Sequence, residues 1–247
     1  ALSFGPGEGE YLYLKHQLEN CPINKTLAVV IDTWDSENYM QNIVSRPDIV
    51  ALIKRRAEAG GSIVFRPDSG IPAEQVDMVL EALAAIFGYQ RNSKGYKVLN
   101  YSVRCIQGDG MTEDSIIALY KGIVRNKWST DNLFVGSGGG LLQVDANRDT
   151  QRFAIKPSCG IIAGQQVSFK KAPKSDPTKG SKAGELKVIP ALNGDMMTIS
   201  SLDNNPASFG SFVDLKKTVF LNGKHTPNKF EDIIERSNRP FGKFFYV

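Results

Sequence analysis

Two periods of apolar residues alternate along the first half of the chain. Short runs rich in β-branched and aromatic residues occur at 27–32, 63–68, 101–107 and 132–140. Between them, at 49–61, 73–88 and 112–127, apolar residues recur three or four positions apart, which is the spacing of an amphipathic helix. Thr112 is the predicted N-cap of the last of these helices. Strands that alternate with such helices predict βαβ units and a parallel sheet.

The pattern changes after Arg152, where regular alternation stops. Asn-Gly pairs, which are hairpin turn signals, occur at 193–194 and 222–223. The second part therefore has the character of a β-rich appendage. Its predicted elements are one more strand at 153–162, a loop rich in lysine, proline and glycine at 170–187, hairpins at 187–200 and 217–226, and a short helix at 230–237.

Polar residues and glycines follow each predicted strand of the first half. In parallel α/β folds the chemistry lies at the carboxyl ends of the strands. If these strands are neighbours, their exit loops share one edge, and we expect them to surround one pocket. The exits carry Asp32, then Arg66 with Asp68, then Gly108-Asp109-Gly110, and finally the glycine-rich stretch 136–140.

These residue types suit a phosphorylated sugar. The glycine-rich stretch could present backbone N–H groups to a phosphate, although a flexible turn has the same composition. Arg66 could hold phosphate through its fork of donors, or form a salt bridge with Asp68. Carboxylates at Asp32, Asp68 and Asp109 could hold Mg²⁺ or sugar hydroxyls, and the alternative for each is a helix N-cap. From the residues alone we predict an α/β enzyme that binds a phosphorylated sugar with Mg²⁺.

Composition excludes several other classes of protein. The 247 residues, 41% of them hydrophobic, are enough for one sizeable core. No apolar run reaches the roughly 20 residues of a membrane helix, so no membrane partner is expected. Three cysteines without a CxxC motif predict reduced thiols in a cytoplasmic protein, and two isolated histidines make a histidine-built metal site improbable. The lysines of 170–187 lack interleaved aromatic residues, so we expect a solvated loop and no nucleic-acid partner.

Five blocks of sequence stand out: FRPDSG at 65–70, NSKGYK at 92–97, IQGDG at 106–110, GSGGGLLQ at 136–143 and TVFLNGK at 218–224. These blocks resemble the nicotinamide phosphoribosyltransferase family, in the family's order and at similar spacing. The resemblance extends from about residue 27 to about residue 235. It implies a type II phosphoribosyltransferase fold, an irregular α/β barrel with an added β domain. Residues 1–152 would then supply a barrel portion with ribose- and phosphate-binding loops, and 153–247 the last barrel strand or strands, the β-rich appendage and the basic loop.

The resemblance also implies a reaction and a set of residue roles. Nicotinamide and phosphoribosyl pyrophosphate would give nicotinamide mononucleotide and pyrophosphate in a homodimer that uses Mg²⁺, with the use of ATP left open. Arg66 and Asp68 would be the catalytic pair at the ribose and the pyrophosphate. The implied binding residues are Asp32 near the ribose and ring, Gly108 and Asp109 at the ribose hydroxyls, Gly138 and Gly139 at the 5′-phosphate, Arg148 reaching phosphate from the neighbouring subunit, and Lys156 and Lys170 as further phosphate-side lysines.

Part of the family's site falls outside this sequence. The aromatic pair that clamps the base, the carboxylate that selects amide over acid, and the phosphorylatable histidine all belong upstream, and neither His16 nor His225 matches that histidine. We therefore expect a fragment, or one piece of a split enzyme, that is inactive alone. The alternatives are a nicotinate phosphoribosyltransferase, a different phosphosugar-binding barrel such as a sugar-phosphate isomerase, and a binding module without catalysis.

Overall fold

The computed structural model describes residues 1–143, 150, 155–191, 195–203 and 213–238. The chain forms two compact units. Unit 1 contains residues 1–156 and 171–181, and unit 2 contains 157–170 and 182–247. The boundary predicted between residues 152 and 153 lies outside the described residues. The lysine-rich loop is divided between the units, because its 171–181 portion belongs to unit 1.

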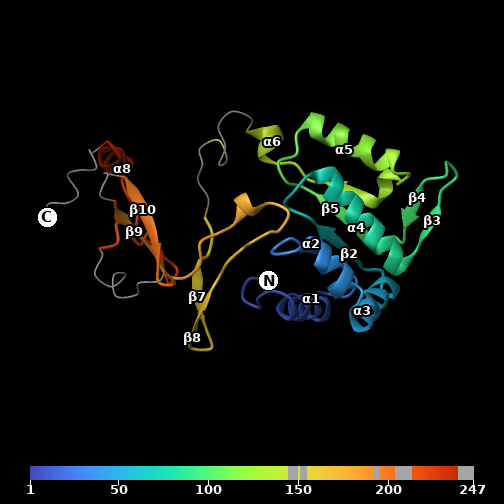
Figure 1. The fold of residues 1–247 in the computed structure, drawn as a ribbon, viewed down its shortest axis with the longest axis horizontal. Coiled ribbons are helices and arrows are strands. Elements are labelled where there is room, and N and C mark those ends of the chain that lie inside the picture. Colours follow the sequence, from blue (N-terminus) through green and yellow to red (C-terminus); the bar gives the residue numbers. More distant parts are fainter. Residues whose placement is uncertain (144–149, 151–154, 192–194, 204–212, 239–247) are drawn as a thin grey trace. The chain divides into compact units, whose positions relative to one another are not determined.

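Unit 1 is built on a four-stranded parallel sheet. Its strands run in the order β1 (Thr26–Val30), β2 (Ser62–Arg66), β5 (Val103–Gln107) and β6 (Leu133–Val135). All three pairings are parallel. In Figure 1, strands β2 and β5 of this sheet lie beside helix α4. The predicted parallel α/β arrangement of the first half is thus confirmed.

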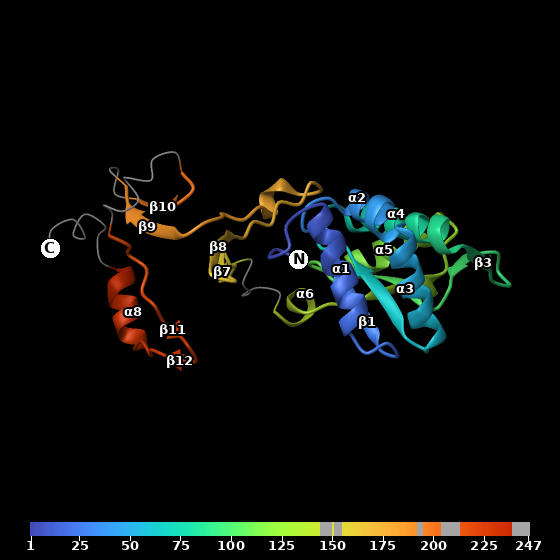
Figure 2. The ribbon, with the colours of Figure 1, turned by 90° about the horizontal axis from the view of Figure 1, so that it is seen from below.

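The helices of unit 1 cover one face of this sheet (Figure 2). The four strands lie side by side in this sheet in the order in which they occur along the chain. Right-handed crossovers between them therefore place every connecting helix on the same side of the sheet. The core lies between these helices and the inward residues Val29, Phe65, Cys105 and Leu133. Within residues 1–143, the helical elements are α1 (Glu8–Asn20), α2 (Ser36–Asn38), the π-helix η1 (Tyr39–Val44), α3 (Pro47–Glu58), α4 (Pro72–Phe87), α5 (Glu113–Arg125), the 3-10 turn η2 (Thr130–Asn132) and α6 (Gly139–Leu142).

Local sequence explains where the main helices begin and end. Pro47 and Pro72 stand at the first positions of α3 and α4, where a missing N–H costs nothing. Gly88 ends α4 with φ of 75°, a value that favours glycine. Thr112 caps α5 together with Ser115, as the sequence predicted.

The opposite face of the sheet carries apolar side chains in solvent. Val30 on β1 is 39% exposed and Phe134 on β6 is 55% exposed. Parallel sheets are normally covered on both faces. A sheet with sequential strand order and helices on one side only is the arrangement found in α/β barrels. The described residues provide four parallel strands of such a sheet, and closure into a barrel remains a proposal.

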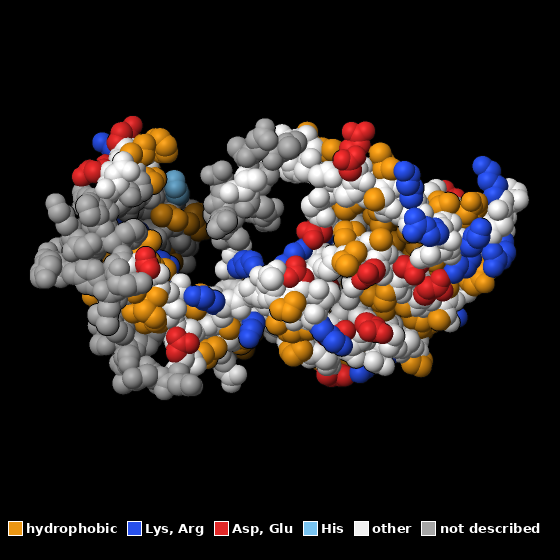
Figure 3. Space-filling view, turned by 45° about the horizontal axis from the view of Figure 1, so that its top comes forward, with side chains coloured by type: hydrophobic (Ala, Val, Ile, Leu, Met, Phe, Trp, Pro, Cys, Tyr) orange, Lys and Arg blue, Asp and Glu red, His pale blue; other side chains and the backbone are white. Residues whose placement is uncertain are grey.

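A short hairpin projects from unit 1 between α4 and β5. Its strands are β3 (Tyr89–Arg91) and β4 (Lys97–Leu99), and they pair antiparallel. Because α4 returns the chain to the start of β5, the hairpin lies at the amino end of the sheet. The NSKGYK block occupies this hairpin, so it lies away from the strand exits. Lysine and arginine side chains gather at this end of the unit (Figure 3).

Among its described residues, unit 2 has three antiparallel strand pairs and one helix. The predicted turn at 222–223 forms, with positive φ at both Asn222 (50°) and Gly223 (79°). The turn at 193–194 lies outside the described residues, although the strands on either side of it pair. Within the segment predicted as one more strand, β7 pairs with β8 and does not extend the parallel sheet of the described residues. The elements are β7 (Cys159–Ile162), β8 (Gln165–Ser168), β9 (Leu186–Pro190), β10 (Met196–Ser200), β11 (Phe220–Leu221), β12 (Lys224–His225) and α8 (Phe230–Ser237).

Across the described ranges, no helix has both the length and the apolar character needed to span a membrane.

Candidate active site

The four strand exits of unit 1 meet at one edge of the sheet, which we call the rim (residues 31–33, 66–70, 107–111 and 136–140). The Ile31 amide donates to the Arg66 carbonyl at 3.1 Å, which joins the first two exits. Gly108, in the exit loop of β5, lies close to the exits of β2 and β6. A Cβ built on Gly108 would lie 3.6 Å from Arg66 Nη2 and 3.6 Å from the Gly136 carbonyl oxygen. The structure therefore brings together the exit loops that the sequence predicted to converge.

Arg66 and Asp68 form an ion pair at the exit of β2. Arg66 Nη2 donates to Asp68 Oδ1 at 2.7 Å, so the salt-bridge alternative is what the structure shows. Both side chains remain partly exposed, and Arg66 Nε has no hydrogen-bond partner. The pair positions the guanidinium at the rim, where part of it stays accessible to a ligand.

Asp32 is the most unusual carboxylate of the rim. It is 0% exposed, yet neither carboxylate oxygen accepts a hydrogen bond. Its nearest cation is Lys171, whose Nζ lies 3.7 Å from Oδ2. A buried carboxylate with no donors is costly. The N-cap alternative is wrong for this residue, because Asp35 caps α2 instead by accepting from the Asn38 amide.

The GDG loop after β5 is held by a residue that the sequence reading overlooked. The buried side chain of Gln107 accepts from the amides of Gly108 (2.7 Å) and Asp109 (2.8 Å). These bonds fix the loop and turn the Asp109 carboxylate toward the rim. A glutamine directly before a Gly-Asp-Gly turn was the available signal.

The glycine-rich stretch after β6 starts the short helix α6. Ser137 Oγ donates to the Met111 carbonyl at 2.5 Å, which ties this stretch to the GDG loop. A Cβ on Gly138 or Gly139 would meet nothing within 4 Å, so their backbone is open to an approaching group. A Cβ on Gly140 would lie 3.0 Å from the Met111 carbonyl carbon and nearer still to its oxygen. Arg148 lies outside the described residues.

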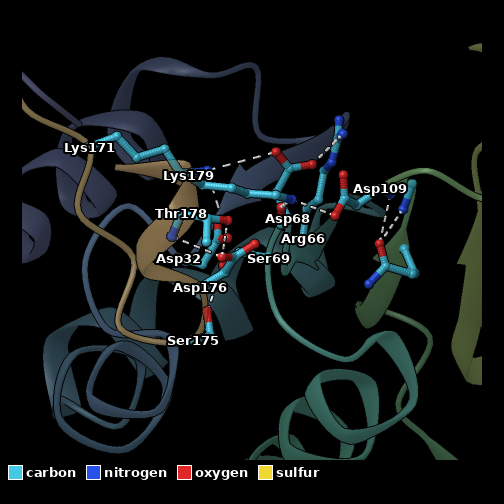
Figure 4. Close-up of polar contacts among 12 residues, drawn as sticks. Asp32, Arg66, Asp68, Ser69, Asp109, Lys171, Ser175, Asp176, Thr178 and Lys179 are labelled. Atoms are coloured by element: carbon cyan, nitrogen blue, oxygen red, sulfur yellow. Dashed lines mark hydrogen bonds and ion pairs between the residues drawn. The ribbon is translucent and has the colours of Figure 1, made fainter. Parts of the chain in front are cut away.

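A segment from far along the chain lies over the rim, and we call Lys171–Ser181 the capping segment (Figure 4). Its two ends are tied together, because Ser181 N donates to the Lys171 carbonyl and Lys171 N donates to Ser181 Oγ. The Ala172 amide donates to the Thr33 carbonyl at 3.0 Å. The hydroxyls of Ser69 and Ser175 share a 2.6 Å hydrogen bond. The tip of the capping segment forms the 3-10 turn η3 (Pro177–Lys179), which Asp176 caps.

Two lysines of the capping segment contact the rim carboxylates. Lys171 Nζ lies between Asp32 and Asp68, at 3.7 and 3.8 Å. Lys179 Nζ donates to Asp109 Oδ2 at 2.5 Å and to the Asp68 carbonyl at 2.6 Å. The prediction that this lysine-rich stretch is simply solvated is wrong for these residues. Of the two lysines predicted on the phosphate side, Lys156 reaches the Lys179 carbonyl at 3.3 Å, while Lys170 belongs to unit 2.

Two further groups are defined by their surroundings. A hydrogen bond to Asp35 raises the pKa of Lys174, so this lysine is cationic. Its partner is Asp35 and not a carboxylate of the rim. Burial raises the pKa of the Cys105 thiol, so this cysteine beneath the rim stays protonated and is a poor nucleophile. All three cysteines have free thiols.

Comparisons with known proteins agree on one family. The model of the nicotinate phosphoribosyltransferase (NAPRTase) family matches residues 51–224. A nicotinamide phosphoribosyltransferase of Xanthomonas campestris pv. campestris is 36% identical over 201 residues, which cover 80% of this chain and 41% of the relative. That of Mycoplasma pneumoniae is 32% identical over 192 residues, covering 72% of this chain and 41% of the relative. The chain thus spans about two fifths of the length of these curated relatives.

Proposed function

Because the chain belongs to the nicotinate phosphoribosyltransferase family, we propose that its rim binds phosphoribosyl pyrophosphate and that the whole protein transfers the phosphoribosyl group to nicotinamide. The observation that carries this proposal is the meeting of Arg66, three aspartates and a glycine-rich loop at one sheet edge. We propose nicotinamide rather than nicotinic acid as the base, because similar relatives are named nicotinamide phosphoribosyltransferases.

The proposed roles follow from where charge develops. The ring nitrogen of nicotinamide attacks ribose C1 as the bond to pyrophosphate breaks, so positive charge builds on the sugar and negative charge on the leaving group. Asp32 and Asp68 suit the sugar side, since carboxylates stabilise developing positive charge. Arg66 suits the pyrophosphate, for which its planar fork of donors is well shaped. Asp109 accepts hydrogen bonds from ribose hydroxyls, and Gly138 and Gly139 offer an unobstructed backbone to the 5′-phosphate.

The rim residues fit a Mg²⁺ that arrives with its substrate. Asp32 offers two carboxylate oxygens that accept no hydrogen bond, and the carboxylates of Asp68 and Asp109 add further oxygen ligands. Within the described ranges, no group of three or more His, Cys, Asp or Glu side chains is arranged to hold a metal ion. Mg²⁺ is commonly held by one or two carboxylates together with substrate phosphates. When bound, it would neutralise charge on the pyrophosphate.

The remaining parts of the site are proposed to come from elsewhere in the assembly. Residues that clamp the base are proposed to lie in the portion of the relatives that this chain does not match. The apolar face marked by Val30 and Phe134 suits a covering layer from that portion, which would also complete the barrel. We propose a homodimer in which Arg148 reaches the neighbouring site. Free thiols suit the reducing cytoplasm.

Calorimetric titration of the chain with phosphoribosyl pyrophosphate and Mg²⁺ tests the proposed ligand. We expect saturable binding that Arg66→Lys weakens at least about tenfold, because lysine cannot make the bidentate contact. Arg55→Lys, on the exposed surface of α3, is the matched control and should leave binding unchanged. Equal affinity of the Arg66 variant and the native chain would refute the assignment of the pyrophosphate site.

The alternatives separate by product and by base. Formation of a mononucleotide with release of pyrophosphate excludes a sugar-phosphate isomerase, which would release none. Competition between nicotinamide and nicotinic acid in the complete protein decides the base. Steeply salt-dependent binding to arbitrary DNA would support a binding module without catalysis.

A further inference from the structure

The capping segment places cations where a metal ion would bind. At the rim, the carboxylates of Asp32, Asp68 and Asp109 face three cationic groups, those of Arg66, Lys171 and Lys179. Each carboxylate lies within 4 Å of at least one of these groups. The charges of the rim are therefore balanced by the chain's own side chains.

These lysines are held in position by more than their charge. The capping segment is tied to the exit of β1 by Ala172 and to the exit of β2 by Ser175, through contacts that do not involve any lysine side chain. The fold of unit 1 itself thus delivers both ammonium groups to the carboxylates. Figure 4 shows Lys171 and Lys179 reaching from this segment to the strand ends.

A divalent cation would have to displace these ammonium groups to reach the carboxylates. Mg²⁺ gives up its water reluctantly and needs several oxygen ligands, while two neighbouring positive charges oppose it. A diphosphate changes this balance, because it offers the lysines new anionic partners and supplies oxygens to the metal. The same movement then frees the buried Asp32 carboxylate, which accepts no hydrogen bond.

We propose that Lys171 and Lys179 exclude free divalent metal from the rim and admit it only together with a diphosphate ligand. Without a ligand, the two ammonium groups occupy the place of the metal beside the rim carboxylates. When the ligand binds, the ammonium groups leave the carboxylates and pair with its phosphates. This inference rests on the proposed use of the rim by a phosphosugar. It adds two points to the proposed function: metal binds together with the diphosphate and not before it, and Lys171 and Lys179 determine this order.

Titration of the chain with Mn²⁺, followed by electron paramagnetic resonance of the free ion, tests the proposal. With Mn²⁺ at about 1 mM, we expect the native chain to show no saturable binding of the ion until inorganic pyrophosphate is added. Lys171→Met and Lys179→Met together should lower the Kd for Mn²⁺ without pyrophosphate at least about tenfold, because two repelling charges are removed. Circular dichroism verifies that each variant is folded, and the single Lys179→Met variant repeats the measurement with a smaller change.

Lys174→Met is the matched control, since Lys174 lies on the same segment but pairs with Asp35 and is 74% exposed. It should bind Mn²⁺ as the native chain does. The proposal is overturned if the double variant binds Mn²⁺ no more tightly than the native chain, or if Lys174→Met gives the same gain. If phosphoribosyl pyrophosphate fails to bind while the double variant still gains Mn²⁺ affinity, the proposed function fails, and of this inference only the exclusion of free metal by the two lysines stands.

Discussion

At the scale of single residues, the charged side chains of unit 1 differ in how their charge is neutralised. At the rim, Arg66 pairs with Asp68 within one loop, and Asp32 and Asp109 pair with lysines of the capping segment. Glu10 on α1 is different, because it is 2% exposed and its carboxylate accepts a hydrogen bond from the Gly7 amide at 3.1 Å. Burial raises the pKa of Glu10 to about 7.

This raised pKa predicts a pH dependence of stability. The folded pKa lies above the unfolded one, so the folded state binds more protons and stability falls as pH rises from about 4.5 to about 7. Glu10→Gln keeps the acceptor for Gly7 and removes the charge. At pH 8 we expect the variant to exceed the native chain in unfolding free energy by about 1–3 kcal/mol, with little difference at pH 4.5. Urea denaturation at both pH values measures this, and an equal difference at the two would count against it.

Arg56 has a structural role that its charge alone would not suggest. It is 1% exposed, and its guanidinium donates to the carbonyl oxygens of Leu18, Cys21, Pro22 and Lys25. It thereby fixes the connection from α1 to β1. Removing a donor from several buried acceptors costs more than the hydrogen bonds themselves contribute.

Arg56→Met is accordingly expected to lower the unfolding free energy by about 2–4 kcal/mol, since methionine fills the space without donors. Guanidinium chloride denaturation measures the change. Arg55→Met, at an exposed position on the same helix, should change it by less than about 0.5 kcal/mol. Similar losses for both variants would show that charge, rather than the carbonyl contacts, matters.

At the scale of elements, the close approach of two loops at the rim depends on one glycine. Gly140 in α6 leaves no room for a side chain beside the Met111 backbone, whereas Gly139 has open space. Gly140→Ala should therefore destabilise unit 1 by about 1–3 kcal/mol and disturb the GDG loop. Gly139→Ala should be neutral or slightly stabilising. Thermal unfolding compares the two, and the idea fails if they shift the melting temperature equally.

The elements divide into those that the sequence predicts and those that it does not. The helices α3, α4 and α5 and the strands between them follow from period and end signals such as Pro47, Gly88 and Thr112. Helix α1 gave no comparable signal, because polar residues surround its few buried ones. The rim loops were predictable because each follows its own strand. The capping segment was not, since Lys179 contacts Asp109 and Asp68 from 70 and 111 residues away.

At the scale of the whole molecule, the described part of unit 1 combines a rim that we propose binds a phosphosugar with a sheet face that bears exposed apolar side chains. We expect the isolated chain to bind phosphoribosyl pyrophosphate without forming nicotinamide mononucleotide, because groups that position the base are proposed to lie in the portion of its relatives that it does not match. Chromatographic assay with nicotinamide, phosphoribosyl pyrophosphate and Mg²⁺ measures product. Robust synthesis by the pure chain would refute the division of the site between this chain and other residues.

The capping segment has a consequence for how unit 1 is made. A ribosome produces the chain from its amino end, so all three rim aspartates emerge before residues 171–181. Until those residues arrive, Asp32 lacks its nearest cation and Asp109 lacks its ion-pair partner. Completion of this unit thus waits for a stretch of polypeptide synthesised after its sheet, and until then Asp32 and Asp109 have no lysine from that stretch to neutralise them.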